Sequence, residues 1–314
     1  MEIIEVEKTP KQLSACVATI GFFDGVHVGH QFMIDNVIRH ARMVGMPSMV
    51  VTFSRHPREV VDGRWHPELL STLAEKVSLL SLTGIDRLAL LPFDAVMASL
   101  SARDFMSSVL CHKLGACVLL MGYDNHFGHR SSDSTEGFPD YARYGLEMNM
   151  TVLRCQPVDI DGIRVSSSKI RQLLRAGDVV KAGHCLGRRY SLTGAVVKGY
   201  HIGTQIGYPT ANLSLTDTLK LVPGAGVYAV RISIDGHGQW NGMMNIGNRP
   251  TFGGSHQTLE VHLLHYSGNL YGHTATVTFV SRLRSEQRFD CAESLAAQLA
   301  ADARQAEQIL NQTP

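Results

Sequence analysis

This sequence is short of charged residues, of aromatic residues and of long apolar runs, and each shortage excludes a class of protein. Charged residues make up 18% and aromatic residues 7% of the 314 residues, and the formal net charge is +1 at pH 7. Basic residues are neither clustered nor interleaved with aromatic residues, so we expect no nucleic-acid partner. No apolar run approaches the roughly 20 residues of a membrane-spanning helix, so we expect no membrane partner.

Cysteine is also scarce, and no two cysteines form a CxxC pair. The six are Cys16, Cys111, Cys117, Cys155, Cys185 and Cys291. Scattered cysteines predict neither a disulfide framework nor a zinc site, and they suit a reducing compartment. The N-terminal segment MEIIEVEKTP is charged and lacks the apolar part of a signal peptide. The sequence therefore predicts a soluble, cytoplasmic protein.

The first half of the chain alternates between strand and helix patterns. Short apolar runs predict buried strands, and apolar residues at helical spacing predict helices between them. The predicted strands are 17–23, 48–53, 87–91, 116–121 and 151–155, and the predicted helices are 31–44, 73–82, 102–113, 138–145, 169–174 and 178–186. This alternation predicts a parallel, doubly wound sheet, which binds ligands outside the carboxyl ends of its strands.

The second half has a different pattern. Short segments rich in Val, Ile, Thr and Tyr are separated by turns such as Asp235-Gly236 and Ser267-Gly268. The segments are 190–197, 227–234, 239–246, 259–266 and 275–280, and only 292–310 returns to helical spacing. We therefore predict an antiparallel barrel or sandwich with a C-terminal helix. The predicted domain boundary lies between residues 186 and 187.

The stretch TIGFFDGVHVGH, from Thr19 to His30, joins the first apolar strand to the first helix. A strand, a glycine-bearing turn and a helix start place free backbone N–H groups and the positive end of a helix dipole where a phosphate can bind. His27 and His30 fall in this turn, where imidazoles can donate hydrogen bonds to phosphoryl oxygens. For two histidines alone, a plain surface turn explains the pattern equally well.

A second stretch, SSSKIR, repeats this setting later in the chain. Ser167 and Ser168 stand at a helix start, where serine often serves only as an N-cap. Because Lys169 and Arg171 follow them, hydroxyls, backbone N–H groups and cations are brought together. That combination predicts a second anion site.

The second half carries a glycine-rich stretch, GYHIGTQIGYPTANL, over residues 199–213. Gly203 and Gly207 make a flexible loop, which alone is a weak signal. Thr210 and Asn212 are two residues apart, so an extended segment places both on one face, and their oxygens suit Mg²⁺. Glu260 alternates with apolar neighbours, and a solvated strand face is its simpler interpretation.

Together these motifs resemble the bacterial bifunctional riboflavin kinase/FAD synthetase family. The matching stretches run in order from about residue 18 to the C-terminal helix: FDGVHVGH, TFSRHPREV, LPFD, GYDNHFG, RVSSSKIR, GYPTANL, PGAGVYAV, NIGNRPTF, LEVHLL and LRSEQRF. The resemblance implies a Rossmann-like α/β nucleotidylyltransferase domain over residues 1–186. A small antiparallel β-barrel riboflavin kinase domain with a C-terminal helix would follow over residues 187–314.

The resemblance implies that the first domain transfers AMP from ATP to FMN, forming FAD and pyrophosphate. The FMN phosphate is already a nucleophile at neutral pH, so catalysis would consist of alignment and charge stabilisation. His27 and His30 match the catalytic histidines. The implied ATP and phosphate ligands are Asp24, Gly29, Arg164, Ser167, Ser168 and Arg171, and the implied flavin contacts are His56, Pro57 and Asp124.

For the second domain the resemblance implies phosphorylation of the riboflavin 5′-hydroxyl by Mg²⁺ and ATP. Thr210 and Asn212 match the metal ligands, with Thr210 also on the phosphates, and Gly203 and Gly207 belong to the loop that closes over them. Glu260 matches the general base, which an alcohol nucleophile needs. The implied small-molecule partners are therefore riboflavin, FMN, FAD and ATP.

The sequence departs from the family pattern at a few positions. Asn125 stands where an aromatic residue is usual, Thr204 where many relatives have arginine, and Ser54-Arg55 where an acidic residue and a proline are common. These departures leave two alternatives open. The protein is a flavin carrier or sensor without catalysis, or an enzyme with only one active domain.

Overall fold

The computed structural model describes the chain except residues 7–11, 57–58, 60–67, 124, 126, 129–135, 199–209, 252–253 and 313–314. For residues 248–251 and 254–256 only the backbone is described. Contacts divide the chain into two units, Met1–Ser167 and Ser168–Pro314. None of the helices in the described part of the chain combines the length and apolar character needed to cross a membrane.

A six-stranded parallel sheet forms the centre of the first unit. Its strand order is β1-β4-β3-β2-β5-β6, and every neighbouring pair is parallel. The strands are β1 (Glu2–Glu5), β2 (Cys16–Ile20), β3 (Ser48–Phe53), β4 (Arg87–Leu91), β5 (Ala116–Met121) and β6 (Thr151–Arg154). The predicted doubly wound sheet is confirmed. Sequence reasoning missed β1, which has only four residues, two of them glutamates, and pairs with β4 at the sheet edge.

Helices cover both faces of this sheet. On one face, α1 (Val28–Val44) and α3 (Leu73–Ser81) contribute to one apolar cluster, and on the other α5 (Ala102–Asp104), η3 (Phe105–Lys113) and α6 (Phe138–Glu147) contribute to a second. The predicted helix 102–113 is present as α5 continued by the π-helical η3. A short helix α4 (Ala95–Ser99) and a hairpin of β7 (Asp159–Ile160) and β8 (Ile163–Arg164) complete the unit.

The strand order reverses between β2 and β5. From β2 the chain proceeds outward through β3 and β4, and then crosses to the other side of β2 to form β5 and β6. Open α/β sheets bind ligands outside the carboxyl ends of the strands at such a reversal. The histidine turn follows β2, so the fold itself places it at this position.

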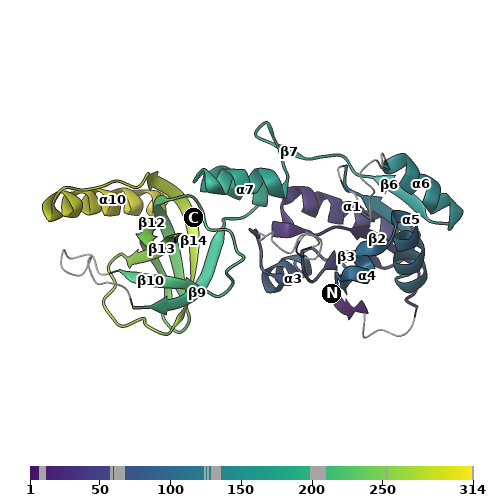
Figure 1. The fold of residues 1–314 in the computed structure, drawn as a ribbon, viewed down its shortest axis with the longest axis horizontal. Helices are drawn as coiled ribbons and strands as arrows, with labels where there is room; N and C mark the ends of the chain where they lie inside the picture. The colour runs from purple at the N-terminus through teal and green to yellow at the C-terminus, as the bar shows by residue number, and fades with distance from the viewer. Residues whose placement is uncertain are drawn as a thin grey trace. The chain divides into compact units, whose positions relative to one another are not determined.

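The second unit is built on a closed antiparallel barrel (Figure 1). Its strand order is β10-β13-β12-β11-β14-β9, and β9 completes the ring by pairing with both β10 and β14. The strands are β9 (Ser191–Val197), β10 (Ala211–Leu215), β11 (Gly226–Ile234), β12 (Gly238–Thr251), β13 (Gly254–Leu263) and β14 (Thr274–Arg284). Of the two predicted architectures, barrel and sandwich, the structure is the barrel.

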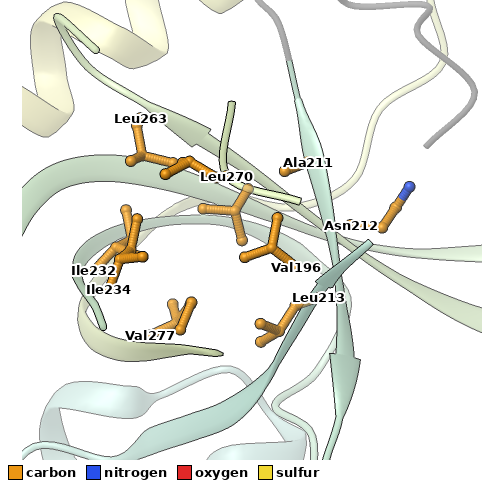
Figure 2. A pocket seen from close by; sticks show the side chains of 11 residues that line it. Val196, Ala211, Asn212, Leu213, Ile232, Ile234, Leu263, Leu270 and Val277 are labelled. Carbon is orange, nitrogen blue, oxygen red and sulfur yellow. The ribbon is translucent and has the colours of Figure 1, made fainter. Parts of the chain in front are cut away.

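Aliphatic side chains fill the barrel (Figure 2). They include Val196, Leu213, Ile232, Leu263 and Val277. The ring is tight where β9 and β10 meet, because a Cβ at Gly194 would lie 2.2 Å from the carbonyl oxygen of Ser214. Only glycine allows these two backbones to approach so closely.

Three helices of the described residues belong mainly to the second unit: α7 (Ser167–Arg175), α8 (Val179–Leu186) and α10 (Ala292–Gln312). Helix α7 is tied to the barrel because the N–H of Gly224 donates to the carbonyl of Leu174 at 2.9 Å. Helix α10 is tied by a buried ion pair in which the Arg284 guanidinium lies 2.8 Å from the Asp302 carboxylate. The contacts thus divide the chain before α7, whereas the predicted functional boundary follows α8.

Candidate active sites

The histidine turn begins with a strained backbone. Phe23 has φ 55°, Gly25 φ 76° and Val26 φ 39°. Glycine accepts a positive φ, but for Phe23 and the β-branched Val26 it costs on the order of 1–3 kcal/mol each. A turn of this kind persists only where its surroundings hold it, and such backbones cluster at binding and catalytic sites.

Asp24 is one of the groups that hold this turn. Its carboxylate is 2% exposed and accepts hydrogen bonds from the backbone N–H groups of Leu70, at 2.9 Å, and Ser71, at 3.1 Å. The N–H of Gly25 donates to the Ser71 hydroxyl at 2.9 Å. These contacts give the Asp24 carboxylate a framework role at the start of α3. Its predicted contact with nucleotide or flavin stays a prediction.

The two histidines of the turn lie face to face. Their ring centroids are 3.5 Å apart and the ring planes differ by 15°. The backbone N–H of His30 donates to Nδ1 of His27 at 3.2 Å, which caps α1. Because Nδ1 accepts, a neutral His27 carries its proton on Nε2. Gly29 leaves room for the ring, since a Cβ at that position would lie 3.2 Å from the His27 ring, a tight contact.

His30 is the chemically unusual member of the pair. Burial lowers its pKa well below the ordinary value, and the neighbouring His27 and Lys76 lower the pKa further. His30 is therefore neutral at pH 7 and offers one N–H donor. Its Nδ1 is one of the few buried side-chain atoms, among those the structure describes, that lack a hydrogen-bond partner. Buried polar atoms are normally paired, so this unpaired nitrogen is an exception within the turn.

The other predicted phosphate ligands fall into two groups. The hydroxyl of Ser167 donates to the backbone carbonyl of Asp24 at 3.0 Å, so Ser167 lies at the histidine turn. Arg164 is exposed and its guanidinium binds both carboxylate oxygens of Asp159, at 3.0 and 3.4 Å. Ser168 and Arg171 belong to the second unit, and their convergence on the turn stays a prediction.

The predicted flavin side of the first unit is only partly described. His56 is half-buried, and its ring meets the ring of Phe22 edge to face at 4.5 Å. Pro57 and Asp124 lie outside the described residues. Asn125, a departure from the family pattern, donates from its side-chain amide to the carbonyl of Ile20. This residue therefore fixes the loop after β5 to the end of β2, at the strand reversal.

Lys76 was missed by sequence reasoning. It lies on α3 and is 3% exposed, and its ammonium donates to the carbonyls of Phe53, at 2.9 Å, and Phe22, at 3.1 Å, and to the Thr52 hydroxyl at 3.3 Å. The only feature of the sequence that could have indicated Lys76 was a single cation within the helical pattern 73–82. A lysine there is usually a solvated side chain, so the signal was too weak to use.

In the barrel, Glu260 lies between two asparagines. It pairs with Asn212 of β10 on one side and with Asn245 of β12 on the other. Residues directly opposite one another on neighbouring strands share a face, with Cβ atoms about 4.5–5.5 Å apart. Their apolar sequence neighbours line the interior, so all three side chains belong to the outer face, and Figure 2 shows Asn212 pointing away from the interior. Asn245 had no role in the sequence-based prediction.

These residues suit a hard cation. Thr210 is half-buried directly before β10, and with Asn212 and Glu260 it supplies hydroxyl, amide and carboxylate oxygens, which Mg²⁺ prefers. Within the described part of the chain there is no group of three His, Cys, Asp or Glu residues arranged to hold a metal. Gly203 and Gly207 lie outside the described residues.

The barrel interior itself is no substrate site. Its lining is apolar except for Asn212, whose side chain points away from it, and the cavity measures only about 10 Å³. That volume is at the lower limit for one water molecule. The polar residues predicted for the kinase reaction are on the outer face of the barrel, and their role stays a prediction.

Comparison with known proteins identifies both halves. A family model described as FAD synthetase matches residues 9–169, and one described as riboflavin kinase matches residues 186–310. The bifunctional riboflavin kinase/FMN adenylyltransferase of Pseudomonas fluorescens is 41% identical over 91% of this chain and 90% of its own length. Its counterpart in Escherichia coli K12 is 36% identical over the same shares of the two chains.

A solved structure shares the fold over nearly the whole chain. The crystal structure described as a macrolide-efflux protein from Streptococcus pneumoniae matches with a TM-score of 0.85 and 31% identity, covering 98% of each chain. The order of the two family matches is also the order of the two folds, the parallel sheet first and the barrel second. The chain therefore belongs to the family of bifunctional riboflavin kinases/FMN adenylyltransferases.

Proposed function

We propose that the two activities of this family are divided between the two units, with FMN adenylylation at the histidine turn and riboflavin phosphorylation on the outer face of the barrel. The predicted functional boundary, between residues 186 and 187, is supported by the start of the kinase family match at residue 186. In this assignment FMN is the product of one site and the substrate of the other.

At the histidine turn, an oxygen of the FMN phosphate attacks the α-phosphorus of ATP, and the bond to the leaving pyrophosphate breaks. No base is needed, because the nucleophile is already ionised. His27 donates from Nε2 and His30 from its one N–H to phosphoryl oxygens as charge develops, together with the free N–H groups at the start of α1. The observation that carries this assignment is the stacked histidine pair, with its unpaired buried Nδ1, at the strand reversal.

On the barrel, Glu260 accepts the proton of the riboflavin 5′-hydroxyl while the γ-phosphoryl group passes from ATP to that oxygen and ADP departs. Thr210 and Asn212 would hold Mg²⁺, which neutralises phosphate charge when bound. Asn245 and Asn212, on either side of Glu260 in the register, hold the carboxylate in place on this face. The position of Glu260 between two amide side chains carries this assignment.

The assignment is tested by separating the two steps chromatographically. His30→Ala should stop FAD formation from FMN and ATP while FMN formation from riboflavin continues. Glu260→Ala should do the reverse. If either variant lost both activities equally while retaining its fold, the division into two sites would be wrong.

We also propose a cytoplasmic location, with neither nucleic acid nor membrane as partner. The described cysteines, which include all six of the chain, are free thiols, and this suits a reducing compartment. Secretion of the protein in fractionated cells would contradict the proposal.

A further inference from the structure

Lys76 is a buried cation whose hydrogen bonds are all made to the active-site end of the sheet. An ammonium has three donors, and Lys76 uses them on the carbonyls of Phe22 and Phe53 and on the hydroxyl of Thr52. Burying a charge is costly unless hydrogen bonds compensate it. The three hydrogen bonds compensate the buried charge of Lys76.

The contacts join the carboxyl ends of two neighbouring strands. Phe53 is the last residue of β3, and Phe22 lies beyond the end of β2, directly before the left-handed Phe23. The Thr52 hydroxyl also donates to the carbonyl of Phe22, at 3.1 Å. This carbonyl therefore receives two hydrogen bonds. The position from which the histidine turn departs is thereby fixed to β3 and α3.

Lys76 also contacts the flavin side of the predicted site. Its ammonium lies 4.1 Å from the centroid of the Phe22 ring, and that ring contacts His56 edge to face. A cation over an aromatic face stabilises the ring position. Lys76 thus contacts Phe22 through both backbone and ring, and Phe22 lies between the histidine turn and His56.

The charge of Lys76 is held between two titratable groups of the turn. Burial lowers the pKa of Lys76 to about 8, and the Asp24 carboxylate opposes this shift. In return, the charge of Lys76 contributes to the lowered pKa of His30. Among the described residues these are the groups through which Lys76 is electrostatically coupled to the turn. Its protonation therefore changes in the pH range where the enzyme can be assayed.

We propose that Lys76 is a positioning residue for FMN adenylylation: its ammonium joins the ends of β2 and β3 to the Phe22 backbone and ring, and so sets the histidine turn against the ATP phosphates. The proposal rests on the assignment of adenylylation to the histidine turn. Lys76 contacts no substrate in this account. It acts through Phe22, and it has no part in the kinase reaction.

The test compares Lys76→Met and Lys76→Arg with the wild type, using kinase activity in the same sample as an internal control. Lys76→Met keeps the apolar stem and removes the three donors, so we expect kcat for FAD formation to fall about 100-fold, the loss typical of a misplacement near 1 Å. The KM for FMN should change only a few-fold, and kinase activity should not change. Lys76→Arg should restore part of the loss. Lys113→Met, at the end of η3, is the matched control and should retain both activities.

A pH profile distinguishes positioning by the charged form from a merely structural contribution. In the wild type, kcat/KM for FAD formation should fall as the pH rises through about 8, because the free enzyme loses the ammonium. Lys76→Met should lack this decline. A wild-type rate for Lys76→Met, or an unchanged decline in that variant, would overturn the proposal.

Thr52→Val keeps the test decisive if Lys76→Met does not fold. It preserves side-chain shape while removing one acceptor of Lys76 and one donor to Phe22, and FAD formation should fall about tenfold, a free-energy change of about 1.4 kcal/mol. A wild-type rate in Thr52→Val would count against the proposal. His30→Ala distinguishes failure of the site assignment from failure of the Lys76 proposal. If His30→Ala retains FAD formation, the assigned site is wrong. If His30→Ala loses FAD formation but Lys76→Met does not, only the role of Lys76 is rejected.

Discussion

The two candidate sites of this chain are held in place by different means. The histidine turn is fixed by buried polar contacts: Asp24 binds the loop before α3, Lys76 binds two strand ends, and the histidines stack on each other. On the barrel, strand register places Glu260 between two asparagines, and all three side chains are half-buried. The first arrangement costs backbone strain, and the second costs none.

This difference matches the chemistry of the two reactions. A phosphate nucleophile brings its own charge, so the adenylylation site needs aligned donors, and rigid placement supplies them. An alcohol nucleophile must lose a proton, so the kinase site needs a carboxylate that the hydroxyl can reach. Rigid alignment thus suits a nucleophile that is already charged, and an accessible base suits a nucleophile that must first lose a proton.

The largest expected effect is a loss of stability of the second unit, with the stability of the first unit unchanged. Asp302→Ala leaves the Arg284 guanidinium buried, 15% exposed, without the carboxylate that pairs with it. Removing one partner of a buried ion pair costs about 3–5 kcal/mol. We expect kinase activity to be lost at much lower urea concentration than in the wild type, with the urea dependence of FAD formation unchanged. Glu147→Ala, which removes a surface pair with Arg103, should cost about 0–1 kcal/mol, and an equal effect of the two variants would contradict the prediction.

A smaller effect is expected in the first unit from Asp24→Asn. The amide keeps the shape of the carboxylate but loses its charge, and one of its two polar groups is a donor facing the N–H groups of Leu70 and Ser71. Hydrogen bonds to charged groups contribute about 1.5–3 kcal/mol. FAD formation should become sensitive to urea at lower concentration, while the kinase is unaffected. Equal sensitivity of both activities would show that Asp24 does not act locally.

Asn245→Ala sharpens the comparison on the kinase side. It removes one of the two amides beside Glu260 without introducing a charge, so we expect kcat for FMN formation to fall about tenfold, or about 1.4 kcal/mol. The matched control is Asn241→Ala, at a half-buried position nearer the start of β12. If Asn245→Ala changed FAD formation from supplied FMN, the assignment of Asn245 to the kinase reaction would be wrong.

The smallest effect concerns acid pH. The pKa of His30 lies well below its ordinary value of 6.5 because of burial. As the pH falls below 6.5, the unfolded chain binds a proton that the folded turn does not, so the folded first unit loses stability. The stability is fully present above pH 6.5. Urea unfolding of the first unit, followed by its susceptibility to protease at pH 7.5 and 5.5, should show this loss, and His30→Asn should reduce it; an equal loss in that variant would assign the effect to other groups.

Local patterns predicted the elements of this fold better than their pairing. The apolar runs of β2, β3 and β5 and the Val-, Ile-, Thr- and Tyr-rich segments of β11 and β14 are properties of short segments. These strands lie at or near the predicted residues, although β2 ends at Ile20 and not at residue 23. The choice between barrel and sandwich was not predictable, because it depends on β9 pairing with β14, far away in the sequence. β1 was missed because two of its four residues are charged and it lies at an edge.

The candidate sites divide in the same way. His27 and His30 are neighbours in sequence, and the glycine turn around them predicted a shared position, which the stacked rings confirm. The contacts of Lys76 and Asn245 depend on tertiary structure. The sequence around a lysine on a helix or an asparagine on a strand does not predict which residues it contacts. Long-range contacts of this kind are what a single sequence does not display.

Closure of the barrel by its first and last strands also orders events during synthesis. The sheet of the first unit is complete once β6 has left the ribosome, whereas β9 waits for β14 before the ring can close. At roughly 5–20 residues per second, that wait lasts from about 4 to about 17 seconds. A growing chain therefore completes the fold that consumes FMN before the fold that produces it, and β9 needs protection from unwanted partners in the meantime.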